Sequence, residues 1–408
     1  MMDAAPELPA GRFALVNGSV VLPHDRVEGK AVVVEDGTIL GIEDVGALGD
    51  DIPKISVDGR LITPGRSDVH PLGALGPRFD DPLAEGYATS TGEQARRGVT
   101  AVLATLTTAP LPGMLAALRF CQDWMSQPRP GAQVLGAHVE GPFFSHEEKG
   151  AQDDDYILTP EDSPADSLLE YHDVIRVLTC APEVPGALDL IRRLVGLGIV
   201  PAAGHSNARD VEVLAAMEAG LRHTIHIWSG QSSTIRVGAW RRPGLLETTL
   251  AFDELTAEMI SDNRHLPPTL MKLAYKCKGP DRLCVVSDAT GGAGLPEGTV
   301  FGSAEMEYVV GDGVALLPDG TSFAGSTTLL DRMLTVLTTV VGIPVVEAVR
   351  MASLTPARVI GVEDRKGSLE AGKDADLAVF DADFRVWQTM IRGQWVWTAY
   401  PTLASIQK

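Results

Sequence analysis

Short apolar runs broken by turn dipeptides dominate both ends of the chain. The N-terminal runs are FALVNGSVVLP (13–23), KAVVVEDGTILGIED (30–44) and ISVDGRLITPG (55–65). Each contains Asn-Gly or Asp-Gly, and these dipeptides are strong signals for β-hairpins. The same pattern returns after about residue 365, where Arg392-Gly393 is expected to form a turn. We therefore predict one small β domain that is built from residues 1–62 and 365–408.

The middle of the chain, residues 63–364, instead alternates apolar strands with helical patterns. The predicted strands include TAVLATLTT (100–108), AQVLGAHVEG (132–141), VIRVLTCAPE (174–183), IVPAAGHS (199–206), HTIHIWSG (223–230) and RLCVVSDAT (282–290). Helical patterns follow most of them, and STTLLDRMLTVLTTVV (326–341) and PVVEAVRMASLTPARVIGV (344–362) predict two closing helices. Seven or eight βα units with continuous apolar strands favour a parallel α/β architecture closed into a (β/α)8 barrel.

Composition and charge exclude several classes of protein. The 408 residues carry a formal net charge of −20, which argues against nucleic acid as a partner because such proteins need a basic face. No apolar run is long enough to cross a bilayer, and the start MMDAAPELPAGRF lacks the basic and apolar regions of a signal peptide. The four cysteines are scattered without a CxxC pair, so we expect a cytoplasmic protein.

Polar residues close the predicted barrel strands. The segment VLGAHVEGPFF (134–144) ends a buried strand with a carboxylate beside a turn, and burial of such a charge requires a partner or a metal. Barrel enzymes carry their chemistry at the carboxyl ends of the strands. The residues at those positions are Asp68, His70, Glu140, His205, His226 and Asp288.

This set of side chains predicts a metal centre. Glu140, His205 and His226 form a ligand set of catalytic zinc, which uses three protein ligands and leaves one position for water. A bound cation acidifies that water, and Asp288 is placed to accept its proton and pass it to a leaving group. A single histidine on an apolar strand is more often a core residue, and we assign that role, or one behind the ligands, to His138 and His223.

Several of these motifs resemble the N-acetylglucosamine-6-phosphate deacetylases of the amidohydrolase superfamily. They are HVEGPF, GHSNA, SDAT, MASLTPARVIGV and GSLEAGKDADLAVFD, and the resemblance spans about residues 60–385. It implies a (β/α)8 TIM-like barrel, residues 63–364, with a small β-sandwich made from both chain ends. It also implies that Glu140, His205 and His226 hold the metal, that Asp288 is the catalytic acid and base, and that the enzyme is a homodimer.

The chain departs from the family pattern at several positions. The stretch His70-Pro71-Leu72 replaces a His-x-His motif, so we expect one tightly held metal, with His70 as a ligand of a second metal or as a residue behind the first. Gln152 stands where the family has a histidine that contacts the amide carbonyl, and Ser229-Gly230 replaces Asn-Ala. The resemblance further implies that His265 contacts the substrate and that Arg241 binds phosphate, reaching in from a neighbouring subunit.

These observations lead to one main hypothesis and two alternatives. We expect metal-dependent hydrolysis of the N-acetyl amide of an amino sugar, with N-acetylglucosamine 6-phosphate giving glucosamine 6-phosphate and acetate. The changes at Gln152 and Ser229-Gly230 leave open a deacylase of another, non-phosphorylated N-acyl amino compound, and a catalytically silent barrel used for binding is the third possibility. Zinc is the expected metal, although iron, cobalt or manganese suits the same ligands. We expect no nucleic-acid or membrane partner.

Overall fold

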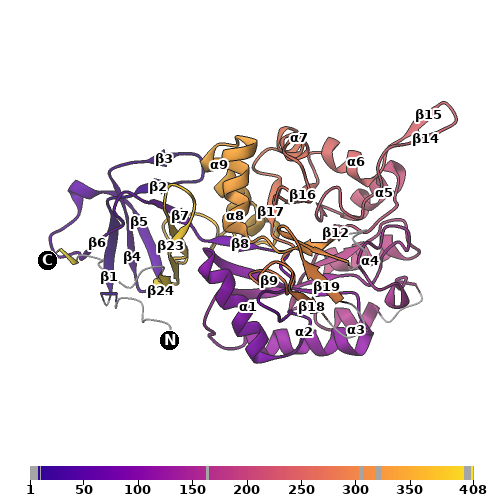
Figure 1. The fold of residues 1–408 in the computed structure, drawn as a ribbon, viewed down its shortest axis with the longest axis horizontal. Coiled ribbons are helices and arrows are strands. Elements are labelled where there is room, and N and C mark those ends of the chain that lie inside the picture. The colour runs from indigo at the N-terminus through magenta and orange to yellow at the C-terminus, as the bar shows by residue number, and fades with distance from the viewer. Residues whose placement is uncertain are drawn as a thin grey trace.

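The computed structural model describes residues 8–9, 11–161, 165–302, 307–317 and 323–398, together with the backbone of residues 406–407. A central barrel is joined to a separate group of strands that lies at the left of the view (Figure 1). None of the helices in the described part of the chain is both long and apolar enough to cross a membrane.

Eight parallel strands form the barrel, which confirms the predicted fold class. In order around the sheet they are β8 (Arg66–Asp68), β9 (Val99–Thr107), β10 (Gln133–Glu140), β11 (Ile175–Cys180), β12 (Val200–Ala203), β13 (His223–Thr224), β16 (Thr256–Ile260) and β17 (Leu283–Val286). No backbone ladder is described between β8 and β17. A side chain bridges this gap, because Asp68 Oδ1 accepts a hydrogen bond of 3.2 Å from the backbone N–H of Ser287.

Helices cover the outside of the barrel. They are α1 (Ala84–Arg96), α2 (Leu111–Met125), α3 (Ala165–Leu169), α4 (Ala187–Gly196), α5 (Asp210–Ala219), α6 (Leu245–Ala251), α7 (Pro268–Lys278), α8 (Leu330–Thr335), α9 (Val345–Ala352) and α10 (Leu354–Val359). Apolar residues such as Leu103, Val177 and Val285 are completely buried, since these strands pack against helices as well as against the barrel interior. This double burial explains the continuous apolar runs in the sequence.

The chain ends contribute to two further sheets. One contains β5 (Thr38–Asp44), β4 (Lys30–Glu35), β1 (Arg12–Val16), β6 (Lys54–Ser56) and β25 (Ile406–Gln407). The other contains β3 (Arg26–Val27), β2 (Ser19–Val21), β7 (Leu61–Pro64), β22 (Leu377–Phe380), β23 (Val386–Ile391) and β24 (Gln394–Thr398). Ile62 pairs with Val379 across the two ends of the chain. Leu15, Val32 and Leu377 belong to one buried cluster that draws on both sheets.

Two of the four turn signals were wrong as hairpin predictions. Asp36-Gly37 joins β4 to its antiparallel neighbour β5, and Arg392-Gly393 joins β23 to β24 in the same way. Asn17-Gly18 and Asp58-Gly59 instead connect strands of different sheets. The Asn or Asp residue has a positive φ in both kinds of turn, as the dipeptide predicts. The turn sets only the local reversal of the chain, while packing between the sheets selects the strand partner.

The segments that close the barrel also differ from the prediction. The segment 326–341 starts at the end of β21 (Phe323–Ser326), and its helix α8 passes into a π-helical turn at Val336–Val341. The predicted helix 344–362 is two helices, because Ser353 leaves the helical conformation at φ −135° and ψ −75°. Two sets of strands outside the barrel were not predicted: the hairpin β14 (Ile235–Val237) and β15 (Trp240–Arg242), and a small sheet of β18 (Val300–Gly302), β19 (Glu307–Val310), β20 (Val314–Leu316) and β21.

Candidate active site

A cavity of about 560 Å³ opens at the carboxyl ends of the barrel strands. Its walls include Glu140, His205, His226 and Asp288, which the strand-end pattern had singled out. Residues of the small inserted sheet, among them Tyr308 and Phe323, line the cavity as well. The structure therefore brings together side chains that are far apart in the sequence, in the place where barrel enzymes carry their chemistry.

Two imidazoles converge on one oxygen of Glu140. Nε2 of His205 and Nε2 of His226 each lie 3.1 Å from Glu140 Oε1. On the far side of each ring, Nδ1 faces a backbone carbonyl: Glu148 O at 3.0 Å for His205 and Ser229 O at 3.2 Å for His226. A carbonyl only accepts hydrogen bonds, so both Nδ1 atoms carry a proton. In a neutral ring, Nε2 then carries a lone pair, and this lone pair faces the carboxylate.

This arrangement fits a bound cation. Acceptor atoms that face one another repel unless a proton or a metal ion lies between them. Donor atoms that are each about 2.1 Å from a tetrahedral zinc ion lie roughly 3.4 Å apart, close to the spacing of the atoms here. Backbone carbonyls that orient the other ring nitrogen are typical of metal-ligating histidines.

His70 completes this cluster from the first barrel strand. Its ring is completely buried, and Nε2 lies 3.5 Å from Glu140 Oε1 and 4.0 Å from Asp288 Oδ1. Among the residues that the structure describes, this Nε2 has no hydrogen-bond partner. A buried nitrogen without a partner is unfavourable, so its position facing Glu140 is a second observation that suits a metal ion. His70, Glu140 and His226 together offer ligand atoms close enough to share one ion.

Asp288 lies beside the cluster in an unusual backbone conformation. Burial raises the pKa of its carboxyl above the usual value, although the neighbouring His70 and His226 act in the opposite direction. Both Asp288 and His205 have positive φ angles, 47° and 46°, which are uncommon for residues other than glycine. Such conformations cost of order 1–3 kcal/mol and concentrate at functional sites. A raised pKa suits a group that must accept and return a proton near neutral pH.

Three of the residues predicted to contact substrate line the cavity: Gln152, Ser229 and His265. The side-chain oxygen of Gln152 accepts a hydrogen bond of 3.1 Å from the backbone N–H of Thr108, which fixes the orientation of the amide and leaves its NH2 group for a ligand. Nδ1 of His265 lies 2.7 Å from Asp262 Oδ2, so the carboxylate orients this ring.

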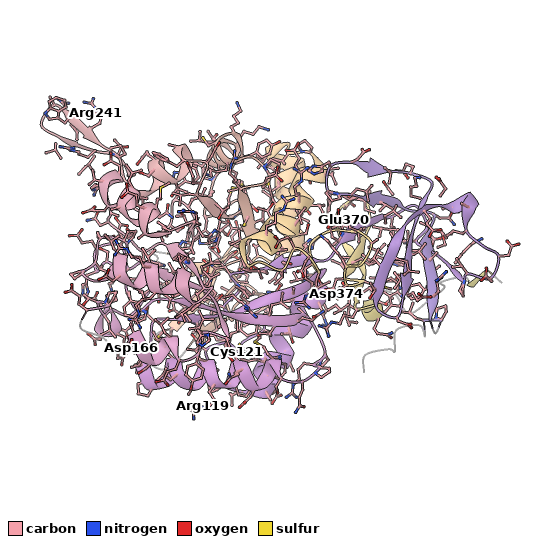
Figure 2. The ribbon with its side chains drawn as sticks, turned by 180° about the vertical axis from the view of Figure 1, so that it is seen from behind. Arg119, Cys121, Asp166, Arg241, Glu370 and Asp374 are labelled. Atoms are coloured by element: carbon pink, nitrogen blue, oxygen red, sulfur yellow. The ribbon has the colours of Figure 1, made fainter. Side chains whose placement is uncertain are left out.

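Two other predicted contacts lie elsewhere. Gly230 is not among the described residues that line the cavity, and it packs behind His205. A Cβ atom at residue 230 would lie 2.7 Å from His205 Nδ1 and 2.9 Å from Glu148 O, so only glycine fits beside this ring. Arg241 is exposed on the hairpin β14–β15, which projects away from the body of the protein (Figure 2). It therefore lies outside the cavity of its own chain.

Sequence reasoning missed two groups of residues. Glu258, in the middle of β16, is completely buried and contacts His70 of the cluster and His223 behind it. The signal was available, since AEMISDN places a carboxylate inside an apolar strand just as AHVEG does. Arg78 and Asp80 form a two-bond ion pair at 2.9 and 2.6 Å on the cavity wall. Their loop carries no local pattern that distinguishes this pair from ordinary surface charge.

Comparisons with known proteins show the family of this chain. The sequence pattern of the amidohydrolase family matches residues 78–396. The chain is 33% identical to N-acetylglucosamine-6-phosphate deacetylase from Vibrio furnissii over 370 residues, which cover 90% of each chain. It is 32% identical to N-acetylgalactosamine-6-phosphate deacetylase from Escherichia coli O157:H7 over 362 residues, covering 88% of this chain and 93% of the relative.

Solved structures are similar over nearly the whole chain. The N-acetylglucosamine-6-phosphate deacetylase from Pasteurella multocida superimposes with a TM-score of 0.87 at 31% identity, covering 94% of this chain and 99% of the other. A mutant of the Mycobacterium smegmatis enzyme in complex with N-acetyl-D-glucosamine-6-phosphate gives a TM-score of 0.88 at 26% identity, with coverage of 95% and 100%.

Proposed function

This chain belongs to the amidohydrolase family, and from that premise we propose that it is a metal-dependent deacetylase of N-acetylated amino sugars. The proposed reaction converts N-acetylglucosamine 6-phosphate and water to glucosamine 6-phosphate and acetate. The observation that carries the proposal is the convergence of three imidazole nitrogens on Glu140 Oε1, beside the buried carboxyl of Asp288. The named relatives act on N-acetylhexosamine phosphates, so they share the acetamido bond that the proposed reaction breaks.

In this proposal Glu140, His205 and His226 hold one divalent cation, with zinc as the expected metal and iron, cobalt or manganese as ions that suit the same donors. His70 faces the same position from behind and is a further ligand, or a ligand of a second ion. When bound, the cation lowers the pKa of a water molecule toward neutrality and polarises the amide carbonyl.

The residues of the chain supply proton transfer and orientation. Asp288 accepts a proton from the attacking water as the new C–O bond forms, and returns it to the amide nitrogen as the C–N bond breaks. Burial raises the pKa of the Asp288 carboxyl and so favours its protonated form between the two steps, while His70 and His226 limit the shift. The NH2 group of Gln152 donates a hydrogen bond to the oxygen that becomes negative, in the role of an oxyanion donor.

The remaining polar groups of the cavity hold the substrate. We assign contacts with the sugar to Ser229 and His265, both of which line the cavity. Gly230, which sequence similarity placed among these contacts, supports His205 from behind through its close packing. Arg241 would bind the phosphate of a substrate in the neighbouring subunit, since its exposed hairpin cannot serve its own cavity. The proposal therefore includes a homodimer.

Two further assignments complete the proposal. Residues 1–62 and 365–408 form the small β-sandwich domain and residues 63–364 the catalytic barrel, which the pairing of β7 with β22 supports. A cytoplasmic location agrees with four free cysteines, of which Cys121, Cys180 and Cys284 are buried.

A specific observation favours a second candidate substrate. Of the described residues that line the cavity, Arg78 is the single lysine or arginine, and it is already paired with Asp80. Asp81 and Asp153 add further negative charge to the wall, so one subunit alone offers a phosphate little attraction. A deacylase of a non-phosphorylated N-acyl amino compound would fit this charge.

One experiment tests the function and separates the two candidates. The purified chain, loaded with zinc and with metal content measured in each sample, is assayed for acetate release from N-acetylglucosamine 6-phosphate and from N-acetylglucosamine. We expect turnover of the phosphorylated sugar with a higher kcat/KM. Turnover of the unphosphorylated sugar alone would establish the second candidate. Absence of acetate from both sugars, with the metal site filled, would contradict the assignment to amino sugars.

A further inference from the structure

Behind the cluster lies a fully buried carboxylate that the proposed reaction does not use. Glu258, on β16, has no exposed surface, and such a charge is stable only when its oxygens are paired. Oε2 lies 2.7 Å from Nδ1 of His70, and Oε1 lies 3.1 Å from Nε2 of His223. The backbone N–H of His226 also points to Oε2 at 3.4 Å. Glu258 thus contacts two residues of the cluster and one histidine behind it.

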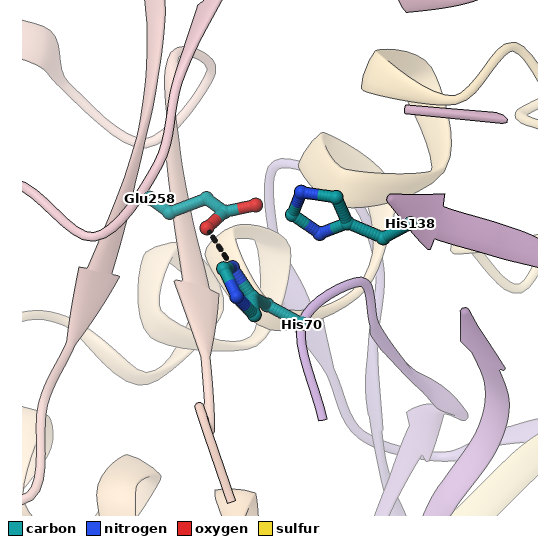
Figure 3. A group of neighbouring side chains, drawn as sticks. All are labelled: His70, His138 and Glu258. Carbon is teal, nitrogen blue, oxygen red and sulfur yellow. Dashed lines mark hydrogen bonds and ion pairs between the residues drawn. The ribbon is translucent and has the colours of Figure 1, made fainter. Parts of the chain in front are cut away.

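One interpretation of this group is a second metal site. Ligand atoms of His70, His138 and Glu258 lie close enough together to share an ion. His138 is not available, however, because Nδ1 faces the carbonyl of Val69 at 3.2 Å and Nε2 faces the hydroxyl of Thr179 at 2.8 Å. Both nitrogens therefore already have hydrogen-bond partners. Figure 3 shows the contact between Glu258 and His70, and no dashed line joins either of them to His138.

The geometry instead describes a directed chain of hydrogen bonds. A carboxylate only accepts, so Nδ1–H of His70 donates to Oε2 and Nε2–H of His223 donates to Oε1. In a neutral ring whose proton is fixed on Nδ1, Nε2 of His70 carries a lone pair. That atom faces Glu140 Oε1 at 3.5 Å and has no hydrogen-bond partner among the described residues.

We propose that Glu258 is a positioning residue that holds His70 in one tautomer, with the Nε2 lone pair directed at the cation site, and that His223 anchors Glu258 in turn. The inference rests on the proposed metal centre and adds a residue that acts on it through His70. Hydrogen bonds of this kind orient ligands and raise their basicity, and their loss typically weakens metal affinity by about 10- to 100-fold.

The test measures zinc affinity by competition with a chromogenic chelator, on the full chain and without substrate. We expect E258Q to bind zinc about 10- to 100-fold more weakly, since an amide cannot accept from both histidines. H70A should show a similar loss, and H70A/E258Q should bind no more weakly than H70A alone, because both changes remove the same interaction. Cobalt(II) bound to E258Q should show an altered d–d absorption spectrum.

The matched control is E93Q, which removes another buried carboxylate, one that pairs with Arg97 at 2.8 Å away from the cavity. Its zinc affinity should equal that of the wild type, and thermal unfolding of the metal-free proteins shows that each variant folds. If E258Q does not fold, H223Q takes its place, and a loss of zinc affinity is again expected.

Unchanged zinc affinity in the folded variant, or losses that simply add in the double variant, would overturn the inference. Wild-type protein that binds zinc but releases no acetate would instead contradict only the proposed reaction. A wild-type chain that binds no zinc would overturn both.

Discussion

Gln152 offers the sharpest test of the proposed chemistry, because related enzymes are expected to have a histidine at this position. Its oxygen is held by the N–H of Thr108 at 3.1 Å, so its NH2 group is the part that can donate to the developing oxyanion. Removing one such donor typically lowers kcat by about 10²- to 10³-fold, or roughly 2.7–4 kcal/mol of transition-state stabilisation. Gln152 is only partly buried, so we expect Q152A to lower kcat by an amount near the lower end of that range, about 10²-fold.

Gln152→Glu separates the donor from the rest of the side chain. Glutamate keeps an oxygen for the N–H of Thr108 but has no NH2 group, and its charge repels the oxyanion. We therefore expect Q152E to lose at least as much kcat as Q152A, while the KM of each variant changes less than its kcat.

The assay is steady-state release of acetate, with zinc content measured in the same samples. Q133A is the control. Gln133 begins strand β10, at the end away from Glu140, so this substitution should leave kcat unchanged. Values of kcat for Q152A and Q152E that both stay within about threefold of the wild type, with the metal retained, would refute the role of Gln152 as an oxyanion donor.

Three further predictions concern the proton donor, the cavity wall and the projecting hairpin. D288N should lower kcat by about 10²- to 10⁴-fold while zinc content stays at the wild-type level. A kcat equal to that of the wild type would exclude Asp288 as acid and base. Burial would raise the pKa of the Asp80 carboxyl, but Arg78 and Thr107 outweigh it and hold that pKa below the usual value. The pair therefore stabilises the fold above the unfolded pKa of about 3.9 and stops doing so as pH falls through the lower folded pKa. Denaturation at pH 7 should show D80N less stable by about 1–3 kcal/mol, a difference that disappears in acid, whereas a constant difference would contradict the linkage. R241A should raise KM for a phosphorylated sugar and leave an unphosphorylated one unaffected, and a parallel change for both sugars would rule out a phosphate contact.

Much of the barrel and part of the site follow from local patterns in the sequence. Continuous apolar runs predict strands that are buried on both faces, and the structure has them in one parallel sheet. The carboxyl ends of parallel strands meet at one face, so the polar residues that close these runs were expected to converge, as Glu140, His205, His226 and Asp288 do. Their roles in metal binding and catalysis stay predictions.

Only the tertiary structure decided which partner each polar group has. Asn17-Gly18 and Asp36-Gly37 are equivalent turn signals, yet one changes sheets and the other closes a hairpin, because burial between the sheets selects the pairing. The contact of His70 with Glu258 joins residues that are 188 positions apart. The periodicity of apolar residues indicates which face of a segment is buried. The direction of the Nε2 lone pair of His70 depends instead on the hydrogen bond between His70 and Glu258, which lies on a distant strand. For that reason the sequence by itself determined which residues gather at the barrel mouth, and the folded chain determined how they are oriented.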